Sequence, residues 1–74
     1  MVRTEGFTRD GNQFVEFRPY RKHSKIVAQV GADQRWFIYL IKAKGEVKTL
    51  EDFPFGQKEL AIRVAYAVAS SFEV

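Results

Sequence analysis

The run from Gln34 to Lys42 constrains the fold more than any other stretch, because its middle is continuously apolar, aromatic and β-branched. Such a composition favours a β-strand. Side chains alternate between the two sides of a strand, so Trp36 would lie on one face of a sheet and Tyr39 on the other, each with apolar neighbours. A sheet built around this strand therefore needs cover on both faces.

Turn-forming residues divide the rest of the first two thirds of the chain. Residues 1–12 contain two glycines and the turn sequence Asp10-Gly11-Asn12, which predicts an N-terminal arm and a turn. The pair Asp10-Gly11 also suits the tight turn of a hairpin. The β-rich runs 13–18 and 25–30 predict two strands before the apolar run, and the run 47–50 predicts a short one after it. We therefore expect an antiparallel sheet of three or four strands within residues 13–50.

The last third of the chain has the pattern of a helix from residue 57 to residue 72. Pro54 ends the preceding strand, and Gly56 is the expected N-cap. One stripe of this helix would face the sheet: Leu60, Val64, Val68 and Phe72, flanked by Ala61 and Ala65. The predicted fold class is α+β, a two-layer single domain over residues 1–74 with the sheet packed by one C-terminal helix.

A second set of apolar helix positions is predicted to point away from the sheet. Ile62, Tyr66 and Ala69 follow the spacing i, i+4, i+7, which gathers them on one side of a helix. An apolar patch of this kind is typical of a contact surface, so we expect a homodimer or a protein partner. A dimer through an open sheet face, on the Trp36 or the Tyr39 side, is the other route. Scattered apolar residues on an ordinary surface are the alternative interpretation.

Positive charge is concentrated in the predicted sheet. The formal net charge is +3, and the segment from Arg18 to Lys48 holds eight cations against two anions. Cations beside aromatic rings suit phosphate contact and base stacking, so we expect nucleic-acid binding there. The residues predicted to contact nucleic acid are Arg18, Arg21, Lys22, Lys25, Arg35, Trp36, Lys42 and Lys44, with Tyr39 as the alternative to Trp36 near the bases. The alternative interpretation is that lysines protect sheet edges from aggregation.

Other classes of function have little support in the sequence. Glu51 and Asp52 are adjacent and so point to opposite sides of an extended chain, which does not make an acid/base pair, and Ser70-Ser71 have no nearby base. The absence of cysteine and the single His23 predict no metal site, and we expect no cofactor. No signal peptide or membrane span is visible, so we expect a cytoplasmic protein. Because no catalytic group of residues is visible either, we expect that it is not an enzyme.

The order of elements, the Arg35-Trp36 opening of a strand, and the helix pattern Glu59-Leu60-Ala61 to Ala65-Tyr66 resemble the DNA-binding domains of the integrase arm type and of the AP2 family. In those families a three-stranded sheet lies in the major groove and a helix braces its back. The resemblance implies DNA binding. In its size and in its short sheet with one helix, the chain is also similar to small phage proteins such as anti-CRISPR inhibitors. That second likeness implies the alternative function, an interaction or inhibitor protein that binds a protein target through apolar patches as a dimer.

Overall fold

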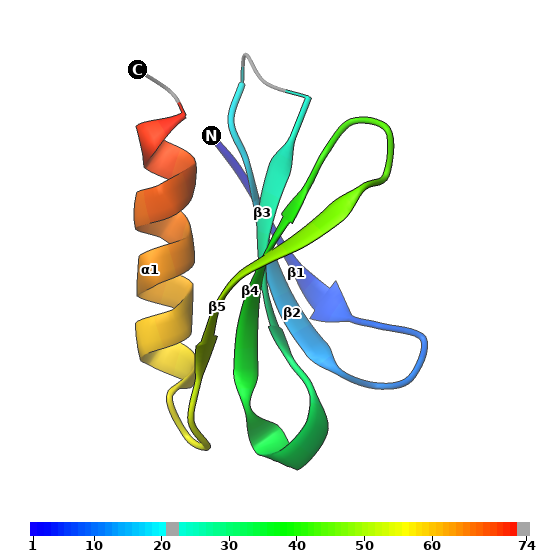
Figure 1. Ribbon diagram of the computed structural model, residues 1–74, viewed down its shortest axis with the longest axis vertical. Helices are drawn as coiled ribbons and strands as arrows, with labels where there is room; N and C mark the ends of the chain where they lie inside the picture. Colours follow the sequence, from blue (N-terminus) through cyan, green and yellow to red (C-terminus); the bar gives the residue numbers. More distant parts are fainter. Residues whose placement is uncertain (21–22, 73–74) are drawn as a thin grey trace.

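The computed structural model, which describes residues 1–20 and 23–72, is a five-stranded antiparallel sheet with one helix against one face (Figure 1). The strands are β1 (Val2–Phe7), β2 (Gln13–Arg18), β3 (Lys25–Val30), β4 (Trp36–Ile41) and β5 (Val47–Phe53), and each pairs with the next. A 3-10 turn, η1 (Ala32–Gln34), precedes β4, and the helix α1 (Lys58–Ser71) follows β5. The predicted α+β class is confirmed, and the predicted count of three or four strands is wrong.

The additional strand is β1, which lies in the segment predicted to be an arm and a turn. It pairs with β2 along its whole length, from Val2 opposite Arg18 to Phe7 opposite Gln13. The loop 8–12 closes this hairpin with hydrogen bonds that include one from the Gly11 amide to the Thr8 carbonyl oxygen at 2.9 Å. Gly11 has a φ of +86°, which suits glycine in a tight turn. The sheet therefore begins at residue 2 rather than at residue 13.

The other boundaries lie close to the predicted ones. The strands β2 and β3 have the predicted bounds, and β4 lies inside the predicted run 34–42. That run was expected at the centre of the sheet, but the central strand is β3. The strand β5 continues past residue 50 to Phe53, and a bulge opposite Ile38 and Tyr39 shifts its register by one residue. The helix has Gln57 rather than Gly56 as its N-cap.

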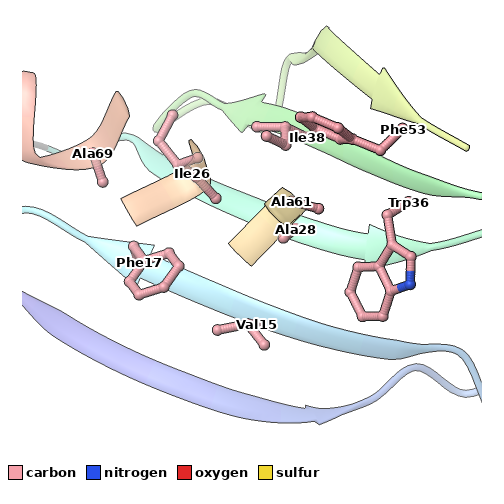
Figure 2. Close-up of a cluster of buried hydrophobic side chains, with 10 residues drawn as sticks. Val15, Phe17, Ile26, Ala28, Trp36, Ile38, Phe53, Ala61 and Ala69 are labelled. Carbon is pink, nitrogen blue, oxygen red and sulfur yellow. The ribbon is translucent and has the colours of Figure 1, made fainter. Parts of the chain in front are cut away.

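The hydrophobic core lies between α1 and the face of the sheet that α1 covers (Figure 2). Large side chains from the four strands β2 to β5 fill most of it, whereas the helix contributes methyl groups. The core residues are Val15, Phe17, Ile26, Ala28, Trp36, Ile38 and Phe53 from the sheet and Ala61, Ala65 and Ala69 from the helix. Because α1 packs chiefly over β3, with β2 and β4 beside it, the edge strands receive little cover.

The helix presents a stripe of alanines to the sheet, not the predicted stripe of larger residues. Ala61, Ala65 and Ala69 are spaced four apart and are fully buried, whereas Leu60 is 41% exposed. The bulky rings already on the sheet leave room only for small side chains beneath the helix axis. Val64, Val68 and Phe72 pack at the margins of the core and are half-buried. The predicted stripe is therefore right in part: its flanking Ala61 and Ala65 lie at the centre of the contact, and the helix is rotated so that Leu60 is exposed.

The alanine stripe generates a prediction about stability. Replacing Ala65 by Leu should lower the free energy of unfolding by about 1–3 kcal/mol, because the extra carbon atoms have no space between helix and sheet. The matched control is Ala67→Leu on the exposed side of the same helix, which should change stability by no more than about 0.5 kcal/mol. Urea unfolding followed by circular dichroism measures both. Equal effects of the two substitutions would contradict this packing.

Candidate binding surface on the helix-free face

The face of the sheet opposite α1 has no covering element within the described residues, and we call it the open face (Figure 1). Strand register and alternation decide which side chains it carries. These residues are Val2, Thr4 and Gly6 on β1, Phe14, Glu16 and Arg18 on β2, Lys25, Val27 and Gln29 on β3, Phe37, Tyr39 and Ile41 on β4, and Val47, Thr49 and Asp52 on β5.

An apolar group occupies the middle of the open face. Phe14, Val27, Phe37, Tyr39 and Ile41 form it, and we call it the aromatic patch. The rings of Phe37 and Tyr39 stack with their centroids 6.0 Å apart and their planes 20° apart. Val27 is only 4% exposed although no helix covers it, because neighbouring side chains on the same face shield it. The rings themselves remain partly exposed and available for contact.

Two glycines give the aromatic rings room to lie across the sheet. Gly6 is opposite Phe14, and a Cβ atom on Gly6 would lie 3.3 Å from Cζ of that ring. A Cβ atom on Gly31 would lie 2.9 Å from Cε2 of Phe37. The sequence interpretation placed Gly6 in an arm and did not assign Phe14 or Phe37 to a site. Alternation within each strand groups Phe14 with Glu16 and groups Phe37 with Tyr39, but only the pairing of β2, β3 and β4 puts the two groups on one face.

Glu16 forms ion pairs with two of the predicted phosphate-binding cations. The Nζ atom of Lys25 lies 2.8 Å from Oε1 of Glu16, and Nη2 of Arg18 lies 3.9 Å from the other carboxylate oxygen. Glu16 and Lys25 are both shielded by their surroundings, whereas the Arg18 side chain is more than half exposed. Arg18 is therefore the more accessible of the two cations.

Two further predicted cations, one before β4 and one after it, also have acidic partners. Arg35 donates a hydrogen bond from Nη2 to Oδ2 of Asp52, and Nζ of Lys42 lies 3.7 Å from Oε2 of Glu46. Lys44 is exposed at the tip of the β4–β5 hairpin and has no ion pair with another described residue. Strand pairing thus brings Asp52, from outside the basic segment, against a predicted cation.

Some predicted contact residues lie elsewhere in the molecule. Trp36 is buried in the core on the helix side of the sheet, so its predicted contact with bases is wrong, and Tyr39 is the aromatic residue of that pair on the open face. The register explains this difference, because positions 36 and 39 of one strand point in opposite directions. Arg21 and Lys22 lie outside the described residues.

The predicted helix surface is also divided by the structure. Ala69 is fully buried in the core, and Ile62 is half-buried and packs against the core, so neither forms part of an exposed patch with Tyr66. Tyr66 itself is 55% exposed, and its ring meets the ring of Phe17 edge to face at a centroid distance of 5.7 Å. Of the three residues of the predicted second apolar surface, only Tyr66 is exposed, and its ring is held on one side by Phe17.

Comparison of the chain with known protein families, curated proteins and solved structures finds no match. Within residues 1–20 and 23–72, no three His, Asp or Glu side chains gather where they would hold a metal ion. The helix in that part of the chain is too short and too polar to cross a membrane. The function therefore has to be inferred from the open face itself.

The contact between Gly31 and Phe37 generates a prediction. Gly31→Ala should lower the free energy of unfolding by about 1–3 kcal/mol, because the new methyl group overlaps the Phe37 ring. In a Phe37→Ala background the same substitution should cost far less, and the difference measures the contact in a double-mutant cycle. Chemical denaturation of the four proteins gives the coupling. A Gly31→Ala cost that is the same in both backgrounds would show that the ring does not occupy this space.

Proposed function

We propose that this protein is a non-enzymatic binding module that takes single-stranded nucleic acid on its open face. The aromatic patch carries the proposal: Phe14, Phe37 and Tyr39 share one uncovered face of a sheet, with cations around them. Partly exposed aromatic rings on a sheet are suited to stacking on unpaired bases, which single strands present and duplexes do not.

The pair of aromatic rings on β4 indicates how a single strand would lie on the proposed site. Phe37 and Tyr39 are two residues apart on the same strand, and their rings are nearly parallel, so a base can stack on the ring face that does not meet the other ring. Phe14 lies two strands away, about 10 Å across the sheet, and extends the platform in the perpendicular direction. Base stacking tolerates any sequence because every base has a π-face, so the expected binding is weakly sequence-dependent.

Phosphate contact would come from the rim of the open face. Arg18 lies on that face, and the 42–46 loop with Lys44 projects from the side of the sheet away from α1 (Figure 1). The exposed pairs of Arg35 with Asp52 and of Lys42 with Glu46 contribute only about 0–1 kcal/mol each, so a phosphate oxygen can replace the carboxylate. In the helix-braced DNA-binding sheets that the chain resembles, the face away from the helix contacts duplex DNA, which supports use of the same face here but not the preference for single strands.

A protein target on the open face is the second candidate. The observation that favours it is the pairing of Lys25 with Glu16 and of Arg35 with Asp52, which leaves an apolar centre and a rim of both charges. Protein interfaces commonly combine an aromatic centre with a polar rim, and the rim charges steer association more than they hold the complex.

Fluorescence anisotropy with a labelled single-stranded DNA of about 16 nucleotides tests the first candidate. Phe37→Ala and Tyr39→Ala should each weaken binding by about fivefold to a hundredfold, because each ring is expected to stack on one base. Arg18→Ala should weaken binding less and should reduce the slope of log affinity against log salt by about 0.7. Duplex DNA of the same sequence should bind more weakly.

The control for the aromatic variants is Phe55→Ala. Phe55 is 70% exposed in the loop between β5 and α1, outside the open face, so its removal should leave affinity unchanged. An absence of binding at low salt, or an equal loss on removing Phe55, would contradict the nucleic-acid proposal. Binding of a protein partner that depends on the aromatic patch, together with DNA binding that does not vary with salt, would favour the second candidate.

A further inference from the structure

The two edges of the sheet differ in how open they are to another strand. The strand β5 carries a bulge beside Tyr39 and has charged residues at Lys48, Glu51 and Asp52, features that blunt an edge. The strand β1 pairs with β2 without any register shift, and its side chains are almost all exposed. Its outer edge is therefore a regular row of backbone donors and acceptors that another strand can pair with.

We propose that this edge pairs with the same edge of a second copy of the chain, with β1 antiparallel to β1 of the partner, so that two sheets become one ten-stranded sheet. An antiparallel pair is related by a two-fold axis perpendicular to the sheet, which keeps each face on the same side. Residues directly opposite each other then share a face. Two residues that face each other must therefore both have even numbers or both have odd numbers. Each allowed register can be named by the sum of the two facing residue numbers, which is the same even number along the whole pair of strands.

The charges of β1 select one of the allowed registers. A sum of six places Arg3 opposite Arg3 of the partner subunit, and a sum of ten places Glu5 opposite Glu5 of the partner subunit, and both arrangements bring like charges together. A sum of eight places Thr4 opposite its own copy and Arg3 opposite Glu5 of the partner subunit, twice by symmetry. Larger shifts pair half of the strand or less. Only the central register therefore combines long pairing with opposite charges.

The positions of the two charged side chains support this register. Nη2 of Arg3 lies 3.4 Å from Oε1 of Glu5 in the same chain, on the helix side of β1, and both side chains are about half exposed. The Arg3 guanidinium also lies 5.6 Å from the centroid of the Phe17 ring, which fixes it above the sheet. Two copies would join these pairs into a ring of four alternating charges. On the open face, the 49% exposed Val2 would come opposite Gly6 of the partner subunit.

The dimer would not require contact between the helices. Since α1 lies mainly over β3, the two helices would be separated by five strand spacings, or about 24 Å, which exceeds the helix diameter. Both would cover the same side of the joined sheet, and the two aromatic patches would share the other. This inference goes beyond the proposed function and does not depend on it, because β1 pairing and nucleic-acid binding are measured separately.

Light scattering over a concentration series at low salt tests the pairing. The wild-type chain should give twice the mass of one chain at tens of micromolar. Arg3→Glu alone and Glu5→Arg alone should each halve that mass, because each puts like charges opposite each other across the two-fold axis. The double variant R3E/E5R should restore the dimer. Circular dichroism melting of each variant shows that loss of mass is not loss of fold.

An equimolar mixture of Arg3→Glu and Glu5→Arg chains should form a mixed dimer although each chain alone does not, because one strand then carries two anions and the other two cations. A wild-type mass of one chain would overturn the proposal. So would a dimer that survives Arg3→Glu, or one that is split by a folded Tyr66→Glu variant, since Tyr66 belongs to the helix and not to β1. DNA binding without dimer formation would overturn the pairing and leave the open-face function standing.

Discussion

The packing of the alanine stripe of α1 against β2, β3 and β4 is the contact on which the rest of the structure depends. Because Ala61, Ala65 and Ala69 present only methyl groups, the helix can lie close to the large side chains of the sheet. A helix of 14 residues is about 21 Å long and covers only the middle of a five-stranded sheet. The outer edge of β1 is left uncovered as a consequence, and no other element within residues 1–20 and 23–72 covers the open face.

The sequence predicts the elements whose side chains carry a strong local signal, and it fails where structure comes from pairing. Each of the strands β2, β3 and β4 combines apolar and β-branched residues over six positions, and the helix keeps a helical spacing of apolar residues over its whole length. The strand β1 has Gly6 in its interior and few apolar residues, so it forms by pairing with β2 rather than by its own propensity. The apolar period of the helix does not show that its alanines lie at the centre of the contact, because it is the large side chains of the sheet that fill that space.

The candidate site shows the same limit. Alternation places Trp36 and Tyr39 on opposite faces, but alternation alone does not decide which face the helix takes, and the helix takes the face of Trp36. The order of charges along the chain does not show which charges meet across strands. Glu16 and Asp52 lie just outside the basic segment from residue 18 to residue 48, and they contact Lys25 and Arg35. Only the strand register reveals these counter-charges.

The partial burial of the aromatic patch bears on which kind of partner gains most from it. Val27 is already shielded, and the Phe14 and Phe37 rings lie against Gly6 and Gly31, so the patch offers a docking protein less apolar area than freely exposed side chains would. Stacking depends instead on the ring faces and on their spacing, which the glycines and the strand geometry hold fixed. Rings that are partly buried and held in fixed positions therefore favour planar bases, which need only a ring face, over a second hydrophobic surface, which needs a larger apolar area.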